Sequence, residues 1–135
     1  MKSLLNLVII SIVLSGACRK TDPEIGGKSA QSLIGKWTYT DYFYSIGGPG
    51  EWHPVEPANQ TIEFKADGSF VPAESFLKGV TRYEVLDSIR IKFHPTSTAS
   101  GFTLMGYSIE KAGKELKMYP IDPLCIEGCN NRFRR

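Results

Sequence analysis

The ten residues from Lys36 to Ser45, KWTYTDYFYS, decide the fold. Aromatic and β-branched side chains dominate this segment, and such residues favour extended backbone. If the alternation of a strand is strict, Trp37, Tyr39, Asp41 and Phe43 lie on one face of it. The segment is therefore predicted to be a strand with one buried face.

Further predicted strands follow at short intervals, at residues 60–65, 69–71, 81–86, 89–94, 102–111, 114–119 and 130–134. The dipeptides Asp67-Gly68, Asp87-Ser88 and Ala112-Gly113 separate successive segments, and residues of these types favour tight turns. Because free sheet edges promote aggregation, we expect the last strand to return to the first. The chain from Leu33 to Arg135 is thus predicted to be all-β, an up-and-down antiparallel barrel of about eight strands.

Residues 1–17, MKSLLNLVIISIVLSGA, have the plan of a signal peptide. Lys2 precedes an apolar run that is shorter than the roughly 20 residues of a membrane-spanning helix, and small residues follow it. The segment LSGAC, which ends at Cys18, resembles the lipobox of bacterial lipoproteins. The resemblance implies cleavage before Cys18 and acylation of its thiol. The alternative is a soluble secreted protein with an ordinary cleavage site.

Residues 18–32 are predicted to be a lipidated, flexible tether between the bilayer and the barrel. The stretch after the cysteine, RKTDPEIGGKSAQS, contains almost no large apolar side chain and includes Pro23, Gly26 and Gly27. A chain of this composition behaves as a flexible coil.

The charge of the chain is nearly balanced, with 16 basic and 14 acidic residues. Removal of Lys2 with the signal peptide leaves 15 basic against 14 acidic residues, a formal charge of +1. A nucleic-acid-binding protein would carry a strong basic stripe, and the only basic cluster here is Arg132, Arg134 and Arg135. Nucleic acid is therefore not an expected partner.

Four motifs of the predicted domain together carry a family resemblance: Gly35-Lys36-Trp37, the Gly-Gly-Pro-Gly loop before Trp52, the segment 64–70, and the segment CIEGCNNRF from Cys125 to Phe133. The domain resembles the lipocalin-like domains of small lipoproteins from Gram-negative bacteria. The resemblance implies that Trp37 plugs the closed end of the barrel. It also implies that a basic residue of the final strand, Arg132 or Arg134, lies across the indole. Arg19, rather than Asp, follows the cysteine, and by analogy with bacterial lipoproteins this implies the outer membrane of the cell envelope as the expected location.

Cys125 and Cys129 are predicted to form a disulfide, because both would be exported together into an oxidising compartment. Zinc is the rival interpretation, with His53 or His94 as further ligands. Structural zinc sites usually show paired ligand spacings, and a second pair is missing from the sequence. No metal and no cofactor are therefore expected.

The sequence offers no catalytic constellation. His53 lies in a Pro-rich loop and His94 ends a predicted strand, so neither is accompanied by a nucleophile and an orienting group. Carboxylates are scattered over turns and outward positions, and no Gly-rich phosphate loop opens a helix. We therefore expect a protein that is not an enzyme.

Two functional hypotheses remain. The first is a binding site for a small apolar or glycan ligand at an aromatic barrel mouth, with tentative contacts from Tyr39, Asp41, Phe43, Trp52, Tyr83 and Tyr107. For Trp52, the alternative is that the irregular loop 46–59 folds back and this side chain caps one end of the barrel. For Asp41, the alternative is a bulge that returns the carboxylate to solvent. The second hypothesis is an interaction module with a filled barrel that binds another envelope protein. The volume of the cavity separates the two, since ligand sites need a void of a few hundred Å³.

Overall fold

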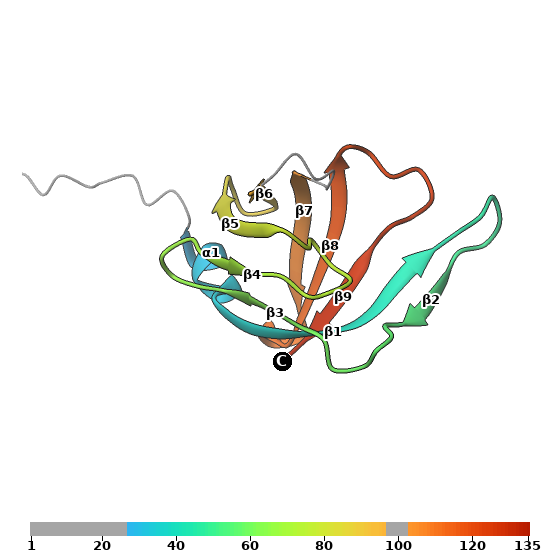
Figure 1. Cartoon of the computed structure of the whole chain (residues 1–135), viewed down its shortest axis with the longest axis horizontal. Helices are drawn as coiled ribbons and strands as arrows, with labels where there is room; N and C mark the ends of the chain where they lie inside the picture. Colours follow the sequence, from blue (N-terminus) through green and yellow to red (C-terminus); the bar gives the residue numbers. More distant parts are fainter. Residues whose placement is uncertain (1–26, 97–102) are drawn as a thin grey trace, which may run out of the picture.

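The computed structural model describes residues 27–96 and 103–135 (Figure 1). The predicted signal peptide, Cys18 and residues 19–26 of the predicted tether lie outside this range. The described chain is almost entirely β-structure, with one short α-helix and one turn of 3₁₀-helix, η1 (Lys111–Gly113).

Eight strands form a nearly closed antiparallel barrel, as predicted. They are β1 (Gly35–Tyr44), β3 (Thr61–Phe64), β4 (Phe70–Val71), β5 (Val80–Val85), β6 (Arg90–Pro95), β7 (Leu104–Glu110), β8 (Glu115–Asp122) and β9 (Asn131–Arg134). The order around the sheet is β4-β3-β1-β9-β8-β7-β6-β5, so each strand pairs with its neighbour in sequence and β9 returns to β1. The remaining seam between β4 and β5 is crossed by a single bridge, Ser69 to Arg82.

Two segments differ from the sequence predictions. The loop 46–59 contains a ninth strand, β2 (Glu51–Pro54), which pairs with the second half of β1 and extends it as a hairpin beyond the barrel (Figure 1). The predicted tether ends in a helix, α1 (Gly27–Leu33), which leads directly into β1. The prediction of a flexible tether up to residue 32 is therefore wrong from Gly27 onward.

A β-bulge divides β1 into two halves, and the alternation of inward and outward side chains shifts by one residue between them. Tyr39 pairs with Phe133 and Asp41 pairs with Arg132, so Thr40 is the extra residue of the bulged strand. An extra residue shifts the two-residue period of the strand by one position. Tyr42 therefore continues the inner face after Tyr39, and Asp41 lies on the outer face.

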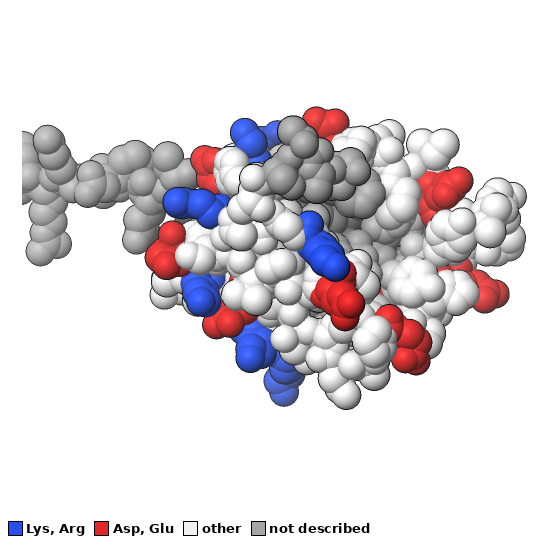
Figure 2. Space-filling view, viewed as in Figure 1, with Lys and Arg blue, Asp and Glu red and all other residues white. Residues whose placement is uncertain are grey.

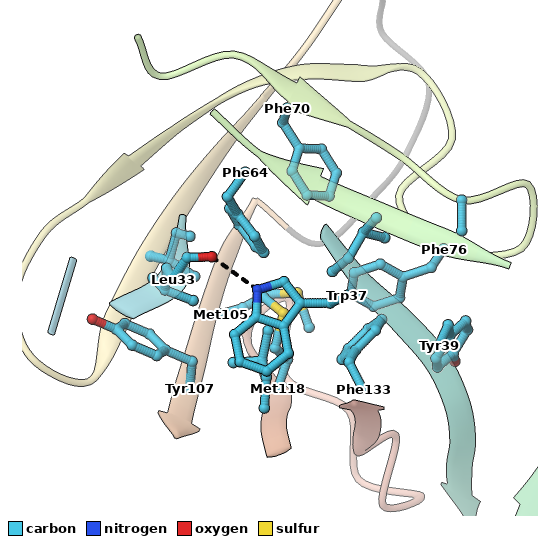
Figure 3. Close-up of a cluster of buried hydrophobic side chains, with 14 of the residues drawn as sticks. Leu33, Trp37, Tyr39, Phe64, Phe70, Phe76, Met105, Tyr107, Met118 and Phe133 are labelled. Atoms are coloured by element: carbon cyan, nitrogen blue, oxygen red, sulfur yellow. Dashed lines mark hydrogen bonds between the residues drawn. The ribbon is translucent and has the colours of Figure 1, made fainter. Parts of the chain in front are cut away.

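The base of the barrel is closed around Trp37, which is fully buried (Figure 3). The indole Nε1 donates a hydrogen bond of 2.8 Å to the carbonyl of Leu33, at the end of α1. The guanidinium of Arg135 lies 4.1 Å from the centre of the indole ring and donates to the carbonyls of Gly113, Ile34 and Ser32. The expectation that Arg132 or Arg134 covers Trp37 is wrong.

The register of β9 explains this correction. Arg132 and Arg134 project from the outer face of β9, whereas Arg135 follows the strand and reaches across the base. Above Trp37, the middle of the barrel is filled by aromatic and aliphatic side chains, among them Phe64, Phe93, Met118 and Phe133.

Candidate ligand site at the barrel mouth

A cleft of about 290 Å³ opens at the end of the barrel opposite Trp37, which we call the mouth. The cleft is lined by Tyr39, Tyr42, Phe43, Tyr44, Val55, Glu56, Ser75, Cys129, Asn130 and Asn131. These residues come from four separate parts of the chain: β1, the β2–β3 connection, the β4–β5 connection and the loop before β9. The site is thus created by the closure of the sheet.

The floor of the cleft is a buried polar pair. The hydroxyl of Tyr39 donates a hydrogen bond of 2.5 Å to Oδ1 of Asn131, and Nδ2 of Asn131 donates to the carbonyl of Cys129 at 3.0 Å. Burial raises the pKa of the Tyr39 phenol well above its ordinary value, and the neighbouring Tyr42 adds to the effect. The phenol therefore keeps its proton at ordinary pH and remains the donor in the hydrogen bond to Asn131.

The bulge positions Tyr42 and Tyr44, which form one wall of the cleft. Tyr42 and Tyr44 continue the inner face of β1, and they remain 40% and 39% exposed because no strand covers them at the mouth. His53 of β2 lies beside Tyr42, with ring centres 5.5 Å apart. Strict alternation placed these tyrosines on the other face, so the sequence analysis missed both.

The loop closed by Cys125 and Cys129 forms another side of the cleft. The two cysteines are disulfide-bonded, with Cα atoms 5.9 Å apart. The loop lies directly over Phe43, because a Cβ at Gly128 would come within 2.8 Å of the Phe43 ring. Two backbone hydrogen bonds, from Ser45 to Glu127 and from Phe43 to Asn130, join the loop to β1. The disulfide therefore shapes the cleft through Cys129.

Asp41 and Trp52 are not in the cleft, contrary to their tentative assignment. Both lie on the outer face, where the guanidinium of Arg132 is 3.8 Å from the centre of the Trp52 ring. A nitrogen of the same guanidinium lies 3.7 Å from a carboxylate oxygen of Asp41. The bulge is the physical reason, since it turns Asp41 and the β2 residues paired with that face outward. Phe43 borders the cleft and also packs edge-on against Trp52.

Tyr83 and Tyr107 lie away from the mouth as well. The Tyr83 hydroxyl donates to the carbonyl of Lys65 at 2.7 Å across the seam of the barrel. Tyr107 is buried, and its hydroxyl donates to the carbonyl of Asp87 at the base. Tyr107 borders a second depression of about 460 Å³ beside α1, which adjoins the start of the described chain. Neither residue can contact a ligand in the mouth cleft.

An ion-pair cluster covers the outer face of β8 and β9. The Glu115 side chain is only 3% exposed, beneath Lys111 at 2.6 Å and Arg134 at 3.4 Å. The hydrogen bond from Lys111 lowers the pKa of Glu115, and Arg134 and Arg132 lower it further. This cluster is on the opposite side of the sheet from the cleft and contributes to the barrel wall.

Within residues 27–96 and 103–135, no three His, Cys, Asp or Glu side chains come together as a metal site. In the same described residues, no helix is long and apolar enough to cross a membrane. No protein-family model, no curated protein and no solved structure matches this chain.

Proposed function

We propose that this chain is a lipid-anchored protein of the bacterial cell envelope that binds a small ligand at the mouth of its barrel. The anchor is the acylated Cys18, and the anchoring membrane is the outer membrane. The observation that carries the binding function is the aromatic-lined cleft of about 290 Å³ at the mouth. Small-molecule sites are concave, mostly apolar and provided with a few placed polar groups.

The size of the cleft limits the ligand. Known small-molecule sites span roughly 300–1,000 Å³, so this cleft is at the lower end of the range. The barrel below it is filled by side chains such as Tyr39, Phe76 and Phe133, which contact one another with ring centres 4.7–5.4 Å apart. The ligand is therefore a compact apolar molecule or a single sugar unit, or one end of a longer molecule that projects into solvent.

The chemistry of the lining supports such a ligand. Tyrosine rings supply flat apolar surface, and the Tyr39–Asn131 pair supplies a fixed polar contact at the floor. Rings with a polar edge are well suited to amphipathic molecules, because they bury carbon surface while satisfying hydroxyl groups.

The test is to isolate the full-length protein from its native host and identify small molecules released on denaturation by mass spectrometry. The variant Tyr42→Ala/Tyr44→Ala, which removes the wall, is expected to lose the co-purifying molecule. Tyr119→Ala is the matched control, because Tyr119 is 41% exposed, like Tyr42, and does not line the cleft. A molecule retained equally by both variants, or absent from the parent protein, contradicts binding at the mouth.

A second candidate function, an interaction module, is favoured by one observation. Three large apolar side chains project into solvent at the mouth end: Ile46 is 79% exposed, Leu124 72% and Ile126 90%. A protein partner would cover such residues. Cross-linking from Ile126→Cys, with Ile89→Cys at the base as control, would detect that partner in the native envelope.

A further inference from the structure

The residues that line the cleft include one charged side chain, the carboxylate of Glu56. Among the residues that the structure describes, no Lys, Arg or His belongs to the lining. A carboxylate or phosphate group in this open cleft would find no cationic partner among the described lining residues, and it would lie near the like charge of Glu56, which is unfavourable. The lining therefore selects against anions.

The chain around the cleft adds to the same field. Residues 37–64 and 118–131, which supply most of the lining, contain no Lys or Arg. They carry the carboxylates Glu51, Glu56, Asp122 and Glu127, while Asp41 lies 3.7 Å from Arg132 and Glu63 is paired in register with Lys36. The third segment at the mouth, residues 72–79, carries Glu74 and Lys78, which cancel in formal charge.

The space-filling view shows this separation of charge. Asp and Glu side chains lie on both halves of the visible face, whereas Lys and Arg side chains gather on the half away from the β1–β2 hairpin (Figure 2). Arg132 is the basic residue nearest to the cleft in sequence, and it lies on the outer face beside Asp41 and Trp52. A negative field at one end of a protein raises the local concentration of cations there.

The aromatic lining can bind a cation that the negative field attracts. The face of an aromatic ring attracts a cation, and quaternary ammonium groups are recognised by clusters of such rings. Tyr42 and Tyr44 line the cleft together with the Glu56 carboxylate, whereas the Tyr39 ring at the floor is stacked on Phe133. The open cleft also leaves an ammonium group partly hydrated, which reduces the cost of binding it.

We propose that the mouth cleft binds its ligand through an ammonium group, which is held by the tyrosine rings and the carboxylate of Glu56. This inference rests on the proposed ligand-binding function and adds a charged group to the ligand proposed there, so that the compact apolar or sugar ligand carries an ammonium group. The ammonium group belongs either to a free compound or to a lipid headgroup.

The test uses choline and its neutral carbon isostere, 3,3-dimethyl-1-butanol, as probes. The two molecules have the same shape and differ in charge at one atom. Each is titrated into the full-length chain in a non-ionic detergent, and binding is followed by NMR shifts of the mouth residues. We expect choline to bind on the order of tenfold tighter than the isostere, the ratio that a cation held over aromatic rings produces.

Variants locate the effect. Glu56→Gln is expected to weaken choline binding about threefold to tenfold and to leave the isostere unchanged, while Glu127→Gln, outside the lining, is expected to weaken choline binding less than Glu56→Gln does. Tyr44→Leu is expected to lower choline affinity, and Tyr44→Phe, which retains the ring, is expected to preserve it. Unchanged far-UV circular dichroism of each variant shows that the barrel remains folded.

O-phosphocholine identifies the source of the ammonium group. Binding at least tenfold weaker than that of choline indicates a free compound, because the phosphate meets Glu56 without a cation nearby. Equal binding indicates a lipid headgroup, and the ammonium inference then still holds.

Two results overturn the inference. If the neutral isostere or methyl glucoside shifts the same mouth residues and binds as tightly as choline, the ammonium inference fails, but ligand binding at the mouth stands. If no probe shifts these residues and no small molecule co-purifies with the protein, the proposed function fails as well.

Discussion

Truncation of Trp37 to alanine tests the closure of the barrel base most directly. The side chain has no solvent exposure, and its Nε1 group donates a hydrogen bond to Leu33. Removing a buried tryptophan costs about 3–5 kcal/mol through lost burial and the cavity that remains. The variant also loses the contact with the Arg135 guanidinium, which lies 4.1 Å above the ring. We expect a loss of about 4 kcal/mol in the free energy of unfolding.

The consequence for the whole domain is large. A domain of this size has a free energy of unfolding of roughly 5–15 kcal/mol. For about 100 residues, each kcal/mol lowers the melting temperature by about 4–8 °C, so Trp37→Ala is expected to lower it by roughly 15–30 °C. The assay is equilibrium unfolding in urea, followed by far-UV circular dichroism because the substitution itself removes a fluorophore.

Trp52 provides the matched control, because each tryptophan of the described chain has an arginine over its ring. Trp52 is 36% exposed, so Trp52→Ala is expected to cost about 1 kcal/mol or less. The reasoning is refuted if Trp37→Ala unfolds within 1 kcal/mol of the parent, or if the two substitutions cost the same.

Three further predictions concern titration and the disulfide. The hydrogen bond from Lys111 lowers the pKa of Glu115, so the ionised carboxylate stabilises the fold at pH values above the ordinary Glu pKa of 4.5, and this stabilisation is lost as the pH falls below 4.5. Urea unfolding between pH 7 and pH 3 should show the loss of stability, and the loss should be smaller in Glu115→Gln. The pKa of Tyr39 is raised, so the stability that its neutral form contributes is present below pH 10 and is lost only in stronger alkali. In an ultraviolet titration, Tyr39→Phe should remove one tyrosine that ionises only in strong alkali. Reduction of Cys125–Cys129 should cost about 2 kcal/mol, because the closed loop is short, and denaturation with and without reductant measures it.

Much of the fold could be predicted because strand signals are local. Alternating side chains and turn residues identified the eight barrel strands to within a few residues, and the need to pair free edges placed β9 beside β1. The short strand β2 was missed because Gly and Pro residues surround it, and those residues normally indicate loops. Its partner, the second half of β1, stabilises it through pairing that the sequence does not display.

The candidate site was predicted less completely, for a reason that can be traced to Thr40. Strict alternation assigned Asp41 to the interior and Tyr42 and Tyr44 to the exterior. The alternative of a bulge that returns Asp41 to solvent is the one that the structure shows, but without a glycine no local signal marks Thr40 as its position. The sequence also could not identify which arginine covers Trp37, because this depends on the register of β9, and only the assembled sheet determines that register. Of the tentative mouth residues, Tyr39, which precedes the bulge, and Phe43, which follows it, line the cleft.

The single extra residue in β1 has a further consequence for how such a protein can diversify. Loss of one codon at Thr40 would exchange the two sides of the hairpin, so that Asp41 and Phe43 would turn inward and Tyr42 and Tyr44 outward. No point substitution could replace an aromatic wall by one containing a carboxylate so completely. Insertions and deletions at this position, rather than changes of side chain, are thus the shortest evolutionary route to a different cargo.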